Sequence, residues 1–491
     1  MPTRTTPRAL LRRLLGLFWL LSLPPCFAAA AAPTATPLVI RDISIVDVRS
    51  GALLPHRTVR IEGGRIAAVV APTDTAAASA AAVQGNAETI DGHGKFLVPG
   101  FIDMHAHLNS RLQARAQSPA VTLSDTDILS PDNLSLFVFN GVTTIQVMHG
   151  DEGMLAMRDA IERGQAIGPR LVVGSPRLDG NPPSDPYPRI VATAAEGIAV
   201  VDEMHQSGYD FIKVYDNLKQ GAYDAIVSRA HQYHLRVDGH LPRTLALEHG
   251  LSGMQDHIAH IEEFVGYAKG GSKADIDRIT AAVKKSGIGV TPTLIVFDNV
   301  LRSVSNLKAV LADPVSAYAD PVVYHSWLAD NNIYQSDHFQ DSRMRAALVR
   351  QFDLMKRLTA AFARAAVPLV VGSDCNISGT VAGFSFHDEL AELARVGIST
   401  ADVLRMATLN AATAMRMDSD LGTVEVGKRA DLVLLQANPL DDLANSRRIA
   451  GVVLRGKWYP QPALRDRVAN AMSDFSKLDQ RLHLQLQRPV P

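Results

Sequence analysis

Short apolar strands alternate with helical stretches from about residue 97 to residue 415, and this pattern constrains the fold most. Strands are predicted at residues 143–147, 170–174, 210–215, 290–296 and 367–372, and helices at 222–234 and 399–415. Such alternation over this length predicts a parallel sheet with helical connections, and a (β/α)8 TIM-like barrel fits the number of elements. Barrels of this kind place functional residues at the C-terminal ends of their strands. Polar side chains at those ends are therefore candidates for function.

The two flanks of this region have a purely β pattern. Strands are predicted within residues 38–70, where Gly63 and Gly64 separate two apolar runs as in a hairpin, and the same character returns at 430–435 and 449–454. A small β-sandwich domain built from both termini is therefore predicted. The expected domain boundaries are 33–96 and 417–462 for the sandwich, 97–416 for the barrel and 463–491 for a C-terminal helix or tail.

Residues 1–32 have the layout of a secretory signal peptide. Four arginines precede an apolar run at residues 14–23, and alanines follow at 28–32. The apolar run is too short to span a bilayer, although a retained N-terminal anchor is the competing interpretation. We expect the protein to be exported, and to be periplasmic or secreted.

Export changes what the composition implies about partners and disulfides. The chain has 49 basic and 50 acidic residues, and removal of the signal would leave a net charge of about −5. This charge does not favour nucleic acid or an anionic membrane as a partner. Cys26 would leave with the signal and Cys375 would stay alone, so no intrachain disulfide is expected. The expected partner is a small-molecule substrate, and a homo-oligomer is a further option.

One long segment interrupts the strand and helix alternation. About seventy residues, 297–366, separate the strand at 290–296 from the next one, and they have a helical pattern that carries several aromatic side chains. Insertions at this end of a barrel often form lids or substrate walls. The alternative is an ordinary helical excursion that packs on itself or on a neighbouring subunit.

The first predicted barrel strand ends in a His-x-His pair. Residues two apart on a strand point to the same side, so His105 and His107 could bind one metal ion together. The chain contains 16 histidines, so roughly half of one His-x-His pair is expected by chance in a chain of this length. The pair becomes a site only if further ligands lie at other strand ends.

Lys213 lies within the predicted strand at residues 210–215, on the same side as Phe211 and Tyr215. Burying its ammonium group costs several kcal/mol unless the group is paired or neutralised. Reaction of the neutral amine with CO2 would give a carbamate, an anionic ligand that can bridge two metal ions. The alternative is a lysine that extends to water at the rim or forms a salt bridge.

Three more polar residues end predicted strands. His240 ends the predicted strand at 235–240 and His260 ends the segment 254–260, and each alone is explained better by a hydrogen-bonded structural histidine than by a ligand. His257 competes with His260, but the odd spacing puts the two on opposite strand faces, and His260 is nearer the strand end. Asp374 ends the last apolar strand, where a carboxylate could bind metal and carry a proton.

With these residues in place, the chain resembles the metal-dependent amidohydrolase superfamily over residues 38–460. The motifs that carry the resemblance are VPGFIDMHAH at 98–107, FIKV at 211–214, GHLP at 239–242, IAH at 258–260, GSD at 372–374, ATLNAA at 407–412 and LGTVEVGKRADL at 421–432. They follow one another in the order of strands one, four, five, six and eight, with the last two in the C-terminal part.

The resemblance implies a binuclear site, with zinc as the expected metal. His105, His107 and Asp374 would hold one metal ion, and His240 with His260 the other. A carboxylated Lys213 and a hydroxide would bridge the two ions. The hydroxide would attack a carbonyl carbon, and Asp374 would pass its proton to the leaving amine. Tyr215 and His149 would lie near the oxyanion, with simple packing at the barrel mouth as the alternative.

Two differences from other branches of the superfamily indicate the subtype of this chain. Deaminases and mononuclear ring hydrolases of the superfamily lack the lysine of strand four and place a glutamate soon after the histidine of strand five, whereas Lys213 is present here and LPRT follows His240. The resemblance therefore implies an amide hydrolase similar to Xaa-Pro dipeptidases and N-acyl amino acid hydrolases. Hydrolysis of a lactone, ester or cyclic amide is the alternative. A non-catalytic relative is disfavoured because such proteins are expected to lose ligands.

Overall fold

The computed structural model describes residues 36–73, 87–108, 133–183, 188–252, 255–375 and 377–489. The predicted signal peptide, residues 1–32, lies outside these ranges. The chain from Ala35 onward is one compact unit, and its described part contains a small sheet and a barrel. No helix among these residues is long and apolar enough to cross a membrane.

The small sheet is built from both ends of the compact unit, as predicted. Its strand order is β17-β16-β15-β5-β1-β2-β3, and β4 pairs with β1. The strands are β1 (Leu38–Asp47), β2 (Ala52–Glu62), β3 (Arg65–Val70), β4 (Glu88–Asp91), β5 (Phe96–Pro99), β15 (Leu432–Leu435), β16 (Ile449–Leu454) and β17 (Lys457–Pro460). Antiparallel pairing of β5 with β15, with Val98 opposite Val433, joins the two halves.

The central region forms a closed ring of parallel strands, which confirms the barrel prediction. Its strands are β6 (Phe101–Ala106), β7 (Val142–Val147), β8 (Arg170–Val173), β11 (Phe211–Val214), β12 (Arg236–Gly239), β13 (His257–Ala259), β14 (Gly289–Thr291) and the extended segment 367–374. The bridge Gly174–Phe211 links the two parallel sheets, and the bridge Val290–Leu369 joins β14 to the segment 367–374. The amide of Asp374 donates to the carbonyl of His105 at 2.7 Å and closes the ring.

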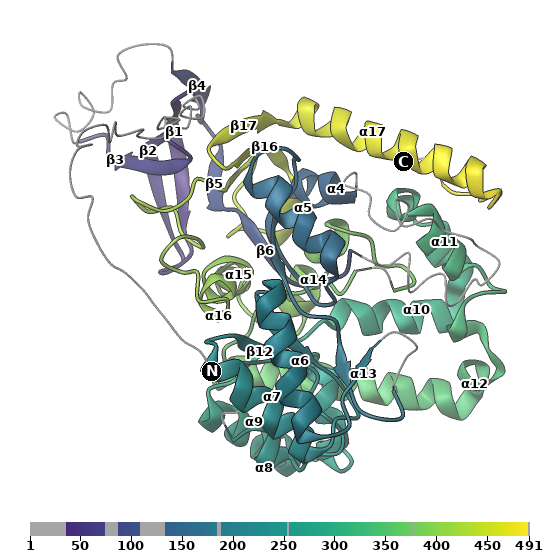
Figure 1. Cartoon of the computed structure of the whole chain (residues 1–491). Helices are drawn as coiled ribbons and strands as arrows, with labels where there is room; N and C mark the ends of the chain where they lie inside the picture. Colours follow the sequence, from purple (N-terminus) through teal and green to yellow (C-terminus); the bar gives the residue numbers. More distant parts are fainter. Residues whose placement is uncertain are drawn as a thin grey trace, which may run out of the picture. The chain divides into compact units, whose positions relative to one another are not determined.

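Helices connect the strands and cover the ring (Figure 1). They are α4 (Asn133–Phe139), α5 (Glu152–Glu162), α6 (Ala194–Ser207), α7 (Gln220–Gln232), α8 (Leu247–Gly250), η1 (Ile261–Ala268), α9 (Lys273–Ser286), α10 (Leu294–Leu311), η2 (Pro314–Tyr318), α11 (Pro321–Trp327), η3 (Ile333–Gln335), α12 (Asp337–Gln340), α13 (Ser342–Arg364), α14 (Phe384–Arg395), α15 (Thr400–Arg405), η4 (Met406–Asn410), α16 (Ala411–Ala414), η5 (Leu443–Arg447) and α17 (Gln461–Leu482). Two short strands, β9 (Leu178–Asp179) and β10 (Arg189–Ile190), follow β8.

One predicted strand is partly wrong. Residues 290–296 are a strand only through Thr291, and α10 begins at Leu294. Thr293 has φ 51°, a left-handed conformation that turns the chain from strand to helix. The apolar letters LIVF after it fit a buried strand and a buried helix equally well, so the pattern alone could not place this boundary.

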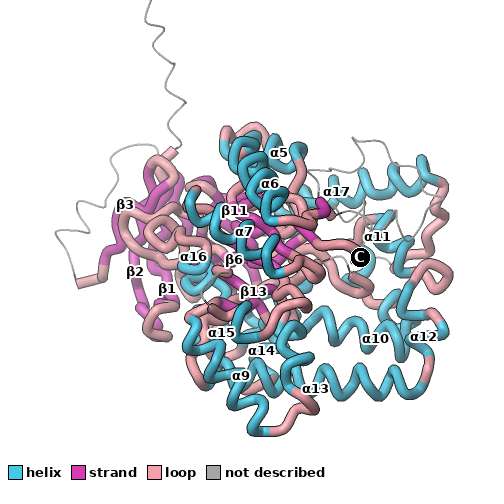
Figure 2. The backbone as a smooth tube through the Cα atoms, turned by 60° about the horizontal axis from the view of Figure 1, so that its bottom comes forward, coloured by secondary structure: helices cyan, strands magenta, loops and turns pink. Residues whose placement is uncertain are grey.

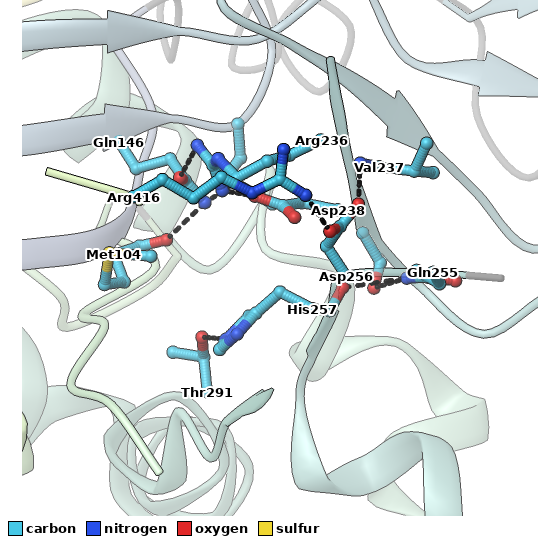
Figure 3. A network of polar contacts seen from close by, with 12 residues as sticks. Met104, Gln146, Arg236, Val237, Asp238, Gln255, Asp256, His257, Thr291 and Arg416 are labelled. Atoms are coloured by element: carbon cyan, nitrogen blue, oxygen red, sulfur yellow. Dashed lines mark hydrogen bonds and ion pairs between the residues drawn. The ribbon is translucent and has the colours of Figure 1, made fainter. Parts of the chain in front are cut away.

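A network of polar contacts surrounds the residues of β12 (Figure 3). Arg236 forms an ion pair with Asp238 and donates to the side-chain oxygen of Gln146 at 2.8 Å. Arg236 and Asp238 are two residues apart in β12 and share one side of it, and His240 follows the end of the strand. The charges of Arg236 and Asp238 neutralise each other deeper in the barrel, and His240 lies nearest to the mouth.

The helical insertion lies across the barrel from the small sheet. In both views, α10, α12 and α13 lie on one side of the barrel, and β1, β2 and β3 lie on the other (Figure 1, Figure 2). Helix α13 is amphipathic, and its buried side chains include Phe352, Met355 and Leu358. The insertion is therefore part of the folded core.

Candidate metal centre

The six predicted ligands meet at one mouth of the barrel. The Nε2 atom of His107 lies 3.0 Å from Asp374, that of His105 lies 3.4 Å away, and that of His260 lies 3.9 Å away. The ring centres of His240 and His260 are 4.8 Å apart. In the ring order, β11 with Lys213 lies between β6 with His105 and β12, which precedes His240. Residues separated by up to about 270 positions thus form one cluster, because parallel strands end at the same edge.

The backbone is strained where three of these strands end. His260, Thr293 and Asp374 have φ values of 70°, 51° and 44°, in the left-handed region that residues other than glycine rarely adopt. Strand alternation therefore stops at Ala259 and does not extend to His260. His257 is buried, contacts Thr291 at 2.6 Å and does not line the cavity, whereas His260 does. Strain of this kind is typical of functional sites.

Two glycines make room for the cluster. A Cβ atom on Gly239 would lie 2.2 Å from the carbonyl oxygen of Val214 and 3.0 Å from Cδ of Lys213. A Cβ atom on Gly372 would lie 2.7 Å from Cβ of His105. Any side chain at either position would displace a predicted ligand.

Lys213 is buried without a hydrogen bond among the described residues. Its side chain is 1% exposed, and its Nζ atom has no hydrogen-bond partner there. Its pKa is lowered to about 8, mainly by burial; the nearby carboxylate of Asp374 opposes the shift, and the guanidinium of Arg177 contributes to it. A lower pKa increases the neutral amine, which is the form that reacts with CO2. The position therefore fits a carbamate ligand better than a permanent ammonium group.

The protonation states suit metal binding. Burial lowers the pKa of His105 well below its usual value and that of His260 to about 3, so both imidazoles are neutral. Burial alone would raise the pKa of Asp374, but the surrounding imidazoles and the hydrogen bond from His107 hold it well below its usual value. Neutral imidazoles and an ionised carboxylate are the ligand forms that divalent metals require.

Two carboxylates that the sequence did not single out hold His240. The Nδ1 atom of His240 lies 2.7 Å from Asp216 and 3.1 Å from Glu263, and both acids are buried. Burial alone would lower the pKa of His240, but Glu263 and Asp216 raise it. Bonds at Nδ1 leave Nε2 as the nitrogen available to a metal. The acidic pair that follows His260 in the sequence is the one signal that could have identified Glu263.

The cluster lies in a cavity of about 400 Å³. Its polar lining includes Arg177, Tyr215 and Arg243 besides the predicted ligands. The ring of Tyr215 lies 4.0 Å from that of His240, between centres, and the guanidinium of Arg177 lies 5.1 Å from the centre of the Tyr215 ring. Arg177, in the loop after β8, was missed because no periodic pattern marks it.

His149 does not line the cavity. It follows β7, is buried, and has its pKa lowered by burial to about 2. Its Nδ1 atom has no hydrogen-bond partner among the described residues. Its predicted contact with substrate stays a prediction, whereas Tyr215 faces the cavity.

The donor set fits a metal centre. The ligand atoms of His105, His260 and Asp374 lie within 4.8 Å of one another. Those of Asp216, His240 and Glu263 are equally close, but the two acids already contact Nδ1 of His240. Imidazole nitrogens and carboxylate oxygens in this number are ligands for zinc and similar divalent metals. The buried amine of Lys213 lines the same cavity and would supply the bridging ligand as a carbamate.

The chain belongs to the Amidohydrolase family, whose model matches residues 96–459. This family generally uses a binuclear metal centre. The match covers the barrel and the C-terminal half of the small sheet, which is the region that the sequence motifs marked.

Curated relatives include adenine deaminase 2 of Rhizobium etli, which is 26% identical over 414 residues. That alignment covers 83% of this chain and 55% of the deaminase, so the chain spans about half the length of this relative. The matched segments cover still less, 13% and 20%, of the adenine deaminases of Rubrobacter xylanophilus and Chelativorans sp..

Solved structures share the fold over most of the chain. Bottromycin amidohydrolase superimposes with a TM-score of 0.67 at 24% identity, covering 89% of this chain and 90% of that one. A Xaa-Pro dipeptidase superimposes with a TM-score of 0.66 at 20% identity, covering 87% of this chain and 100% of that one. At these identities the likeness establishes the fold.

Removing the carboxylates that hold His240 is expected to weaken metal binding. The Asp216→Asn and Glu263→Gln variants keep the shape of each side chain but lose its charge, and such outer ligands usually contribute 10- to 100-fold in metal affinity. Competition with a chromogenic chelator would measure the loss for each variant. The control is Asp277→Asn, which removes the charge of an exposed carboxylate that pairs with Lys273. Unchanged affinity in both site variants would show that neither acid positions His240.

Proposed function

We propose that the protein is an exported two-metal hydrolase that cleaves the C–N bond of a dipeptide or N-acyl amino acid. The observation that carries the proposal is the convergence of His105, His107, His240, His260 and Asp374 around the buried amine of Lys213. Two divalent ions, with zinc as the expected metal, would when bound supply a nucleophilic hydroxide at neutral pH and polarise the substrate carbonyl.

Asp374 is proposed to move the proton. Its carboxylate is ionised and lies within 4 Å of three imidazoles, so it can accept a proton from the attacking water and deliver it to the leaving nitrogen. The neighbouring imidazoles hold the carboxylate in place during this transfer. Lys213, as a carbamate, would contact both ions and so keep the ligands of the first (His105, His107 and Asp374) at a fixed distance from those of the second (His240 and His260).

A free carboxylate on the substrate is supported by the polar side of the cavity. Arg177 is buried beside Tyr215, and the two side chains line the cavity at the ends of β8 and β11. A guanidinium group in a water-poor cavity attracts a carboxylate strongly and can bind it through two parallel hydrogen bonds. Dipeptides and N-acyl amino acids both carry such a group next to the amide.

A substrate panel tests this function. The zinc-loaded full chain is assayed with dipeptides, N-acyl amino acids, γ- and δ-lactones, carboxylic esters and adenine. We expect kcat/KM for the best amide to exceed that of every lactone, ester and nucleobase. Activity confined to lactones or esters would replace the proposal by its main alternative, and ammonia release from adenine alone would replace it by deamination.

Export is part of the proposal and rests on the signal-like residues 1–32. N-terminal sequencing of the protein recovered from the periplasm of an expressing bacterium is expected to show a chain that begins shortly after the alanine run. Recovery of the intact chain from the cytoplasm alone would contradict export and leave the proposed chemistry untouched.

A further inference from the structure

The helical insertion supplies an apolar wall to the cavity. Its apolar cavity-lining side chains include Phe297 and Val300 from α10, Tyr334 from η3, Phe339 from α12, and Leu348 and Met355 from α13, and Gln351 of α13 is a polar member of the lining. Phe297, Val300, Leu348 and Met355 are each less than a tenth exposed. The wall therefore presents mainly hydrocarbon toward the metal ligands.

The wall begins next to the predicted ligands. Thr293 contacts Nδ1 of His260 through its hydroxyl at 2.7 Å, and α10 begins one residue later. Phe297 and Val300 are three residues apart, and Leu348 and Met355 are seven apart, so each pair lies on one side of its helix. Both helices therefore turn a continuous apolar side to the same space.

Polar contacts fix the wall in position. A carboxylate oxygen of Glu389 accepts a hydrogen bond from the amide of Ile295 at 2.7 Å and holds the first turn of α10. Gln335 donates to the carbonyl of Ser303 at 2.6 Å, and Gln351 donates to Glu262 at 3.2 Å. These bonds tie the turns to α10, and α13 to η1 beside the ligands. The insertion is thus a fixed wall of the cavity in this structure.

The apolar wall and the guanidinium of Arg177 lie on opposite sides of the mouth. In the ring order β6, β7, β8, β11, β12, β13, β14 and segment 367–374, strands β8 and β14 are four places apart, which is half the ring. Arg177 follows β8, and α10 follows β14. The predicted metal ligands lie between the two sides.

We propose that the wall is a subsite for a large apolar group on the acyl side of the scissile amide. The proposal rests on the proposed function, because it uses the carboxylate of the leaving amino acid, bound near Arg177, to orient the substrate. The acyl group then extends toward Phe297 and Leu348. The substrate class is an N-acyl amino acid, or a dipeptide with a bulky first residue, whose acyl part is aromatic or branched aliphatic.

A series of substrates with one leaving amino acid tests the subsite. N-acetyl, N-isovaleryl and N-phenylacetyl derivatives of the best amino acid from the panel are compared. Each methylene buried in an apolar pocket changes kcat/KM by roughly 10-fold or more, so the phenylacetyl derivative should exceed the acetyl one by at least about 100-fold. Equal rates for both, with amide hydrolysis retained, would overturn the subsite while leaving the proposed function standing.

Neighbouring positions on α13 provide a matched pair of variants. Leu348 is 7% exposed and lines the cavity, whereas Val349 is 58% exposed and does not. The Leu348→Trp variant should fill the subsite and lower the ratio of phenylacetyl to acetyl kcat/KM by at least about 10-fold. The Val349→Trp variant should keep the ratio of the unmodified chain. A ratio that is the same in both variants would contradict the assignment.

Binding without turnover separates the subsite from the chemistry. Phenylacetate and acetate carry the same carboxylate, so calorimetric titration of the zinc-loaded chain isolates the apolar part. Phenylacetate should bind at least about 10-fold more tightly, and the Leu348→Trp variant should abolish the difference. If the chain hydrolyses no amide but retains this preference, the proposed function fails and the apolar subsite stands. Equal binding of the two acids would overturn the subsite.

Discussion

The Lys213→Ala variant is expected to lose at least one of two bound metal ions per chain. It should also lower kcat/KM for the best amide by about 1,000-fold or more, because a bridging ligand contributes several kcal/mol to the stabilisation of charge in the transition state. Elemental analysis of dialysed protein measures the stoichiometry, and steady-state kinetics measure the rate. Lys219, an exposed lysine at the start of α7, provides the control through Lys219→Ala.

Chemical rescue of the Lys213→Ala variant distinguishes a carbamate from an ammonium group at position 213. The variant has a cavity in place of the lysine side chain, so acetate or propionate can enter and supply the missing carboxylate oxygens. Part of the activity should then return with saturable dependence on the acid, and ethylamine should have no effect. Rescue by ethylamine, or full metal content in the variant, would remove Lys213 from the proposed bridging role.

The Asp374→Asn variant is expected to lose about 1,000-fold in kcat, within the 100- to 10,000-fold range for a general acid–base group. The amide keeps the shape of the side chain but cannot accept a proton. The loss should shrink when the leaving group is p-nitroaniline, because that amine departs with little need of protonation. Elemental analysis serves as the control for lost metal. An equal loss for both leaving groups would assign Asp374 to ligation alone.

Much of the fold could be predicted from the sequence because the strands repeat a simple pattern. Most of the parallel strands are short apolar runs, and the predicted ligands lie at or just beyond strand ends, as His105 and His240 do. Parallel strands end at one edge, so the positions of these residues along the chain were enough to expect them together. The structure brings the six side chains into one cavity.

The remaining features depend on tertiary contacts. Asp216, Glu263 and Arg177 lie beyond the strand ends, in segments whose conformation is set by their neighbours. The positive φ values of His260 and Asp374 redirect side chains that alternation would have placed otherwise. The turn at Thr293 likewise made a helix of what had been predicted as a strand. The insertion suggested a wall near the site, but the sequence did not show which faces of α10 and α13 turn toward the cavity.

The last ring closure joins the beginning and the end of the barrel. Asp103 accepts hydrogen bonds from the amide and hydroxyl of Ser373, at 2.9 Å and 2.6 Å, across 270 positions of the chain. His105 and Asp374 are next to these residues, so the ligand set is divided between the first and last strands. During synthesis, the growing chain carries imidazoles for hundreds of residues before the carboxylate that completes the set is made. The ligand set is therefore complete only once Asp374 has been made, and a chain that stops before it would hold the imidazoles without this carboxylate.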